Sequence, residues 1–208
     1  MAHAAITVPD YATAVLILAD GKVFFGKGCG VQGQTLGEIC FNTALTGYQE
    51  TLTDPSYAGQ IINFTFPHIG NVGVNLEDME AGIPHVKGFI TREPITSPSN
   101  FRHTEHLQSW LERHNMIGIS GVDTRALTHH IRNNGPQNGV IVHFDSSKKT
   151  IDIPALQQQA KDFPSLKGTE LASEVTCDEI YHWDQRQWNL SHGHRTQSEV
   201  KYKVVAYD

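Results

Sequence analysis

The chain has 208 residues, with 16 Lys and Arg against 22 Asp and Glu, so its formal net charge at pH 7 is −6. Proteins that bind nucleic acid or anionic membranes present clustered Lys and Arg, and this chain has no such block. Hydrophobic residues make up 39% of the chain and glycine adds 18 residues, which is the composition of a globular domain. The length predicts one domain, or one domain with part of a second.

The cysteines and the N-terminus predict an intracellular protein without structural metal. Cys29, Cys40 and Cys177 lie far apart and form no CxxC pair, so neither a disulfide scaffold nor a zinc site is indicated. The first residues lack the basic and apolar regions of a signal peptide. The longest apolar run, over 14–19, is too short to span a bilayer. We therefore expect a cytoplasmic location.

The first half of the chain predicts mostly strands. Residues 1–11 are expected to form an N-terminal extension. Residues 14–26 (AVLILADGKVFFG) predict a β-hairpin with Asp20-Gly21 as a two-residue type I′ turn. Five glycines between residues 26 and 37 predict a bulged, loop-rich return. Further strands are predicted over 37–42, 60–66 and 86–91.

The second half predicts helices, each with apolar residues spaced for one buried face. Thr104 is expected to cap the first helix, and Asp123 the second, which Gly135-Pro136 ends. A third helix begins at Asp152, after a strand over 140–144. Strands that come first and helices that come second indicate an α+β or layered β/α architecture.

The end of the chain contains a polar segment followed by a short apolar one. Residues 184–199 are polar and without periodicity, which predicts a linker. Residues 202–208 (YKVVAYD) are apolar and predict a buried strand. Since nothing follows this strand to cover it, we expect it to begin a second domain.

Residues 41–75 form the segment that is richest in turn residues and polar groups. Within it, Asp54-Pro55-Ser56-Tyr57 predicts a type I turn, with Asp at the first position and Pro at the second. Such a turn holds the Ser56 hydroxyl on a stiff backbone, where it could bind the carboxylate or amine of a ligand. The alternative is that Ser56 caps its own turn, and spacing alone favours that structural role.

The other candidate motifs are weaker. His68 is interpreted as a turn residue, and the adjacent His129 and His130 point too far apart to share one metal ion. Cys29 lacks the flanking glycines of a nucleophile elbow. The GxGxxG pattern over 28–33 lies between predicted strands and does not open a helix. The sequence thus predicts no metal site and no phosphate loop, although a Ser/His/Asp hydrolase stays open as an alternative.

The segment over 41–75 closely resembles the N-terminal domain of the small subunit of glutamine-hydrolysing carbamoyl phosphate synthetase. SNFR at 99–102, GVDTRALT at 121–128 and VVAYD at 204–208 resemble further blocks of that family in the same order. The resemblance runs from about Ala12 to Asp208.

The resemblance implies a layered β/β/α fold of the swivelling type and a division of the chain into four parts. These are the extension over 1–11, the small-subunit N-terminal domain over 12–150, a helical segment and polar linker over 151–198, and the first strand of a class I glutamine amidotransferase domain over 199–208.

The resemblance also implies a function for the intact protein. In this family the small subunit hydrolyses glutamine and passes ammonia to the large subunit. The large subunit uses ATP, Mg and bicarbonate to make carbamoyl phosphate for arginine and pyrimidine synthesis. The partners implied are thus the large subunit and L-glutamine, with no nucleic acid and no membrane.

For this chain the resemblance implies a supporting role. The Cys, His and Glu of the amidotransferase triad have no counterparts here, so we assign no catalytic residue, metal or cofactor and expect the chain alone to be inactive. Ser56 matches the serine of the family's TDPSY turn, which reaches the bound glutamine. The alternative is a stand-alone, non-enzymatic interaction module of the same fold.

Overall fold

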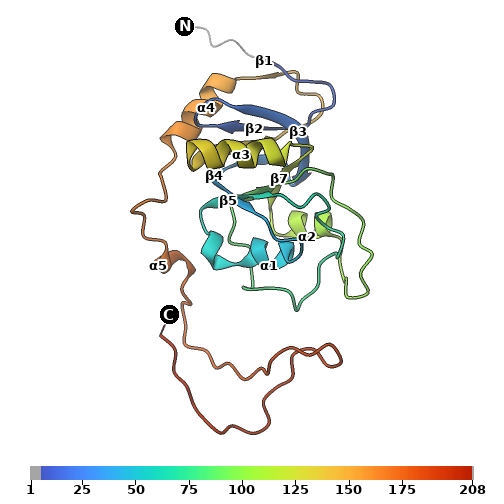
Figure 1. Ribbon diagram of the computed structural model, residues 1–208, viewed down its shortest axis with the longest axis vertical. Coiled ribbons are helices and arrows are strands. Elements are labelled where there is room, and N and C mark those ends of the chain that lie inside the picture. Colours follow the sequence, from blue (N-terminus) through green and yellow to red (C-terminus); the bar gives the residue numbers. More distant parts are fainter. Residues whose placement is uncertain (1–5, 208) are drawn as a thin grey trace. The chain divides into compact units, whose positions relative to one another are not determined.

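The computed structural model describes residues 6–207. They fall into two compact units, one up to Thr169 and the other from Glu170 (Figure 1). Each unit is described by itself.

The first unit is built around seven strands that close into a barrel in the order β2-β3-β7-β6-β5-β4-β8. The strands are β2 (Ala14–Leu18), β3 (Val23–Gly30), β4 (Gly33–Asn42), β5 (Gln60–Phe64), β6 (Gly88–Ile90), β7 (Ile117–Ser120) and β8 (Gln137–His143). Strands β4, β5, β6 and β7 run parallel as successive neighbours, and the remaining pairs are antiparallel. The expected mixture of strands and helices is confirmed, whereas closure into a barrel was not predicted.

The predicted β2–β3 hairpin is confirmed, but its turn is different. The register pairs Ile17 with Val23, and the Leu18 amide donates to the Lys22 carbonyl. Three residues therefore connect the strands, and Gly21 takes a φ of 95° at the last of them. This is a type I turn followed by a left-handed glycine, which also matches the twist of a hairpin.

The prediction of a loop-rich return over 26–37 was wrong, because all five of these glycines lie in β3 or β4. Glycine is needed in this strand because a side chain from another strand lies directly against its backbone. A Cβ atom at Gly28 would overlap the ring of His143, which leans across the sheet from β8. Here glycine indicates a crowded strand rather than a loop.

Strand β2 is buried on both faces, which accounts for its continuous apolar run. Leu16 packs in the cluster that fills the barrel, together with residues of the other strands. Val15 and Ile17 point to the opposite face and pack in a second cluster with Ala160 of α4. The barrel is therefore a filled core with a further apolar layer outside it.

Five α-helices and one short 3-10 helix complete the described chain. They are α1 (Tyr48–Thr53), η1 (Pro55–Tyr57), α2 (Leu107–Arg113), α3 (Thr124–Asn134), α4 (Ile153–Asp162) and α5 (Ala172–Val175). Helix α3 contacts β4 and β5, and its Leu127 and Ile131 belong to the barrel cluster. Helices α1 and α2 share a third apolar cluster on the outer face of β5 and β6.

Two of the three predicted helix caps are confirmed. The Asp123 carboxylate accepts from the amide of Ala126, and the Asp152 carboxylate accepts from that of Ala155. The prediction for α2 was wrong, since Nδ1 of His106 caps it. The Thr104 hydroxyl donates instead to a neighbouring loop, which becomes important at the site described below.

The N-terminal segment is attached to the first unit. Strand β1 (Ile6–Thr7) pairs antiparallel with β9 (Thr150–Ile151), and Val8 is buried. The rest of the predicted extension, residues 1–5, lies outside the described residues. Part of this extension is thus a component of the domain.

The second unit holds α5 and two isolated bridges, Gln185 with Thr196 and Asn189 with Gly193. The strand predicted over 202–208 is not formed over 202–207, where the backbone is irregular and the side chains are exposed. Asp208 lies outside the described residues. No strand of the described chain pairs with this segment, and a strand without a partner has no ladder of hydrogen bonds to hold it.

Candidate functional site

The turn that carries Ser56 has the predicted geometry. The amide of Tyr57 donates to the Asp54 carbonyl at 3.1 Å, and that of Ala58 donates to the Pro55 carbonyl at 3.0 Å, so the type I turn is extended into η1. The Asp54 carboxylate accepts from the Ser56 amide at 2.8 Å. The group that caps this turn is therefore Asp54 and not the serine hydroxyl.

Ser56 itself is exposed, and its hydroxyl makes no hydrogen bond with any residue that the structure describes. The backbone beneath it is fixed by Asp54 and by the rigid proline ring of Pro55. A hydroxyl of this kind is available to an external ligand and loses little backbone entropy on binding it.

Helix α1, which leads into this turn, is anchored by its aromatic and apolar side chains. Leu52 is fully buried, and the Tyr48 hydroxyl donates to the Gly73 carbonyl at 2.6 Å. Burial away from water raises the pKa of the Tyr48 hydroxyl well above its usual value. Helix α1, and with it the backbone that leads into the Ser56 turn, is therefore fixed against the domain.

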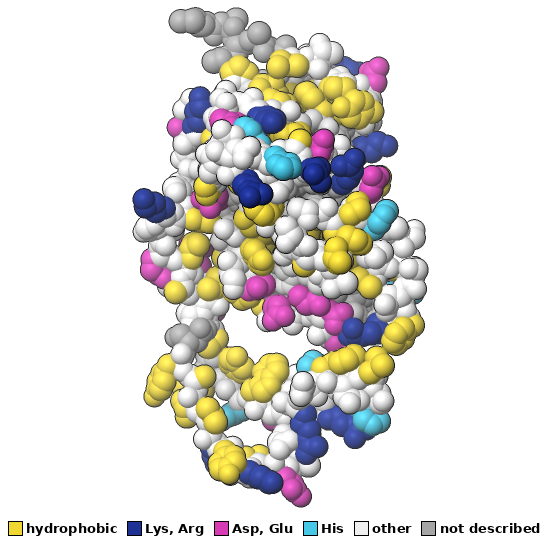
Figure 2. All heavy atoms as spheres, viewed as in Figure 1, with side chains coloured by type: hydrophobic (Ala, Val, Ile, Leu, Met, Phe, Trp, Pro, Cys, Tyr) yellow, Lys and Arg dark blue, Asp and Glu magenta, His cyan; other side chains and the backbone are white. Residues whose placement is uncertain are grey.

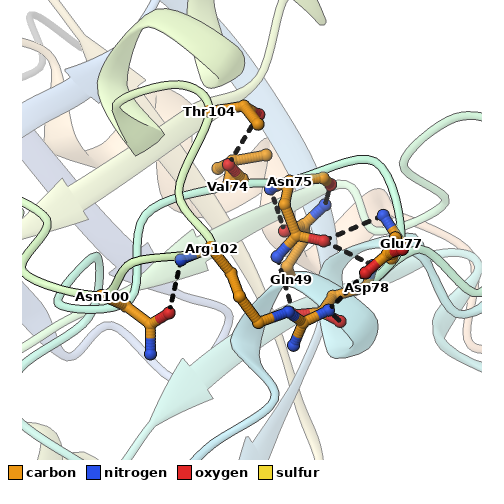
Figure 3. Close-up of polar contacts among 8 residues, drawn as sticks. All are labelled: Gln49, Val74, Asn75, Glu77, Asp78, Asn100, Arg102 and Thr104. Atoms are coloured by element: carbon orange, nitrogen blue, oxygen red, sulfur yellow. Dashed lines mark hydrogen bonds and ion pairs between the residues drawn. The ribbon is translucent and has the colours of Figure 1, made fainter. Parts of the chain in front are cut away.

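A polar network connects α1 to two loops that sequence reasoning did not bring together (Figure 3). Its centre is Gln49, which is only 3% exposed. The Gln49 side chain donates from Nε2 to the Asn75 carbonyl at 2.6 Å and accepts at Oε1 from the Asn75 amide at 3.1 Å. Both backbone polar groups of Asn75 are thus satisfied by one side chain.

The side chain of Asn75 continues the network. Its Oδ1 accepts from the amides of Glu77 and Asp78, and its Nδ2 donates to Oδ2 of Asp78 at 2.8 Å. Arg102 then reaches across from the second loop and donates from Nη2 to Asp78 at 2.7 Å and to Glu77 at 3.1 Å (Figure 3). The loop over 74–80 is therefore held both from α1 and from the loop that contains Arg102.

Glu50 lies close enough to this network for the charges of Asp78 and Arg102 to affect its pKa. Burial raises the pKa of the Glu50 carboxyl above its usual value, and the carboxylates of Asp78 and Glu80 raise it further. Arg102 opposes this rise in the Glu50 pKa. Carboxylates therefore gather around α1, and Arg102 is the cation that opposes their effect on Glu50.

The contacts of the histidines singled out from the sequence do not involve the Ser56 turn. His68 is exposed, and its ring packs edge-on against Phe66. Nε2 of His130 pairs with Oδ2 of Asp20 at 2.5 Å and so ties α3 to the β2–β3 loop, whereas His129 is exposed. Within residues 6–207, no group of three or more His, Cys, Asp or Glu side chains could hold a metal ion.

The cysteines and glycines of the weaker motifs also have structural roles. Burial raises the pKa of Cys29 to about 11, and that of Cys40 to about 11, so both stay protonated near neutral pH. The glycines over 28–33 lie in β3 and at the start of β4, so this GxGxxG pattern opens no helix. None of the described helices is long and apolar enough to cross a membrane.

Comparison with known proteins gives the family. Residues 16–141 match the model of the carbamoyl-phosphate synthase small chain, CPSase domain. The chain belongs to this family. Curated relatives named carbamoyl phosphate synthase small chain include those of Syntrophotalea carbinolica (50% identical, 94% of this chain) and Bradyrhizobium diazoefficiens (49% identical, 96% of this chain). The relative from Zymomonas mobilis is 50% identical over 93% of this chain.

This small-chain family member spans about half the length of the curated relatives it matches, 51% in each of these three. The resemblance drawn from the sequence is therefore correct in its family. The matched region contains Ser56 and the whole network around Asn75. Sequence reasoning missed Gln49, Asn75 and Arg102 as a group, and the only signal was the density of polar residues over 41–75.

Proposed function

We propose that this chain is the N-terminal, non-catalytic part of the small subunit of a glutamine-hydrolysing carbamoyl phosphate synthetase. In this role it docks the large subunit and contributes Ser56 to glutamine binding. The observation that carries the proposal is the family match over 16–141, which contains a rigid turn with an exposed, uncommitted serine hydroxyl.

Ser56 acts in this proposal as a binding group. Its hydroxyl can donate to the carboxylate of glutamine or accept from its amine, and the Asp54 cap keeps the backbone in place while it does so. A hydrogen bond to a charged group is worth about 1.5–3 kcal/mol. Ser56 therefore affects glutamine affinity rather than the chemical step.

The chemical step belongs to the half of the small chain that this chain does not match. Covalent hydrolysis of glutamine needs an activated nucleophile and its base. The two cysteines of the barrel domain have raised pKa values, which is the opposite of what a thiolate nucleophile needs. The use of ATP and Mg belongs in this proposal to the large subunit.

Ser56→Ala in the full-length small chain, assembled with the large subunit, tests the binding role. The KM for glutamine is expected to rise about 10-fold or more, because one hydrogen bond to a charged group is lost. Synthesis from added ammonia should not change. Ser147→Ala is the matched control, since the Ser147 amide is bonded to the Asp145 carboxylate in the same way. An unchanged KM in Ser56→Ala would refute the role.

The 208-residue chain tests the other two parts of the proposal. The purified chain should show no glutamine hydrolysis, and mutation-sensitive hydrolysis would contradict it. The chain should also co-elute with the large subunit in size-exclusion chromatography. Separate elution of both the chain and the full-length small chain would favour the alternative, a stand-alone interaction module.

A further inference from the structure

Two large apolar side chains protrude from neighbouring loops of the first unit. Leu76 is 86% exposed and Phe101 is 83% exposed. The loops run side by side, because Val74 forms an antiparallel bridge with Glu105 and its carbonyl accepts from both the amide and the hydroxyl of Thr104. The ion pair between Arg102 and Asp78 crosses between the same two loops (Figure 3).

Each protruding side chain is adjacent to a residue that the network immobilises. Leu76 follows Asn75, which is 8% exposed and bonded on both backbone groups by Gln49. Phe101 precedes Arg102, whose side chain is bonded to Asp78 and whose amide donates to Asn100. Single exposed apolar residues are ordinary on protein surfaces. Two that are held out on braced adjacent loops are preorganised, so a partner that buries them pays less ordering entropy.

The surroundings of these two side chains are acidic. Glu77, Asp78 and Glu80 lie on the loop of Leu76, and Glu50 lies on the helix behind it. Arg102 forms ion pairs with Glu77 and Asp78. Acidic side chains gather over the region of α1 in Figure 2. A partner that brings Lys or Arg to this rim would relieve the repulsion among these carboxylates.

We propose that Leu76 and Phe101 are the anchors of a docking surface for the large subunit, where they meet an apolar patch with a basic rim. This inference rests on the proposed function, which supplies the partner. Charge complementarity excludes a second copy of the chain, because two acidic rims would face each other and the chain carries a net charge of −6.

The position of the surface also separates it from the glutamine-binding turn. Leu76 is tied through Asn75 to Gln49, in the first turn of α1, whereas Ser56 follows the last turn of that helix. One short helix thus supports both a docking surface and a binding turn, which can be engaged at the same time.

The test uses the full-length small chain and measures its Kd for the large subunit by titration calorimetry. Leu76→Ser and Phe101→Ser are each expected to weaken binding about 30-fold or more, as loss of a central anchor does. Tyr11→Ser is the matched control, because Tyr11 is a similarly exposed apolar side chain on the N-terminal segment. Glutaminase activity of the unassembled small chain should be unchanged in all three variants.

A charge variant keeps the test independent of folding. Glu80 is exposed on the same loop, so Glu80→Lys leaves the buried network intact. It should slow association with the large subunit about 10-fold at low salt and by less at high salt, because added ions screen the rim charges.

The outcomes separate this inference from the proposal beneath it. If the wild-type small chain does not bind the large subunit, the proposed function fails. If the wild-type binds and the Leu76, Phe101 and Glu80 variants bind equally well, only the docking surface is overturned. Loss of glutaminase activity in the unassembled Phe101→Ser chain would also overturn it, since that result would place the surface against the chain's own amidotransferase half.

Discussion

Replacing Gln49 by alanine should remove the bond that joins α1 to the loop over 74–80. The side chain is almost fully buried and holds both the amide and the carbonyl of Asn75. In Gln49→Ala, these two backbone groups stay in the interior without their partner. A buried polar group that loses its hydrogen bond destabilises a protein by more than the bond itself is worth.

The magnitude follows from the two backbone groups of Asn75 that lose their hydrogen-bond partner. Each unsatisfied buried group costs about 1–3 kcal/mol, and Asn75 lies at the edge of the buried region, where water can partly replace the lost bonds. We therefore expect Gln49→Ala to lower the free energy of unfolding by about 2–3 kcal/mol. With a urea dependence of about 2 kcal/mol per M, the unfolding midpoint falls by about 1–1.5 M.

Urea unfolding of the 208-residue chain, followed by far-ultraviolet circular dichroism, measures this change. Gln34→Ala is the control, because the Gln34 amide is exposed and bonds only the Gln159 side chain. It should change the unfolding free energy by less than about 0.5 kcal/mol. A loss below about 1 kcal/mol in Gln49→Ala would refute the reasoning, since it would show that Gln49 does not hold the loop.

Three further predictions concern other parts of the chain. Gly28→Ala should destabilise the barrel by about 1–3 kcal/mol, because its Cβ overlaps the ring of His143, and urea unfolding measures the loss. The unfolding free energy of Glu50→Gln minus that of wild type should be more favourable to the variant at pH 7 than at pH 4. The Glu50 pKa is raised above 4.5 in the folded chain, so its contribution to stability falls as the pH rises through that raised pKa. Cys177 should react first with a thiol reagent at pH 8, because it is exposed whereas the other two thiols have raised pKa values.

Each of these predictions has a result that contradicts it. Unchanged stability in Gly28→Ala would mean that His143 moves aside without cost. An equal difference between Glu50→Gln and wild type at pH 4 and pH 7 would show that the Glu50 pKa is not shifted on folding. Equal labelling rates in wild type and Cys177→Ser would show that Cys29 or Cys40 is the reactive group.

Local chemistry determined much of the secondary structure. Asp123 and Asp152 each precede an apolar-periodic segment, and both cap helices as predicted, because an N-cap depends on only three or four consecutive residues. The type I turn at Ser56 was predicted for the same reason. The β2–β3 hairpin followed from its two apolar runs, although the turn itself needed the strand register, which the sequence does not display.

Long-range packing decided the remainder. Strand β7 was missed because its four residues alternate too briefly to show a period, and only pairing with β3 and β6 makes them a strand. The glycines around Gly28 indicated a loop because the crowding by His143 comes from a strand more than 100 residues later in the chain.

The sequence by itself determined the family, the caps of α3 and α4 and the turn that presents Ser56, since each of these rests on residues close together in the chain. Only the tertiary structure brought Gln49, Asn75 and Arg102 into one network. The bond between Gln49 and Asn75 joins residues 26 positions apart, and the bond between Asp78 and Arg102 joins residues 24 positions apart. The exposure of Leu76 and Phe101 was likewise decided in three dimensions. An apolar residue in a sequence predicts burial, and only the packing of the loops around it shows that it lies at the surface.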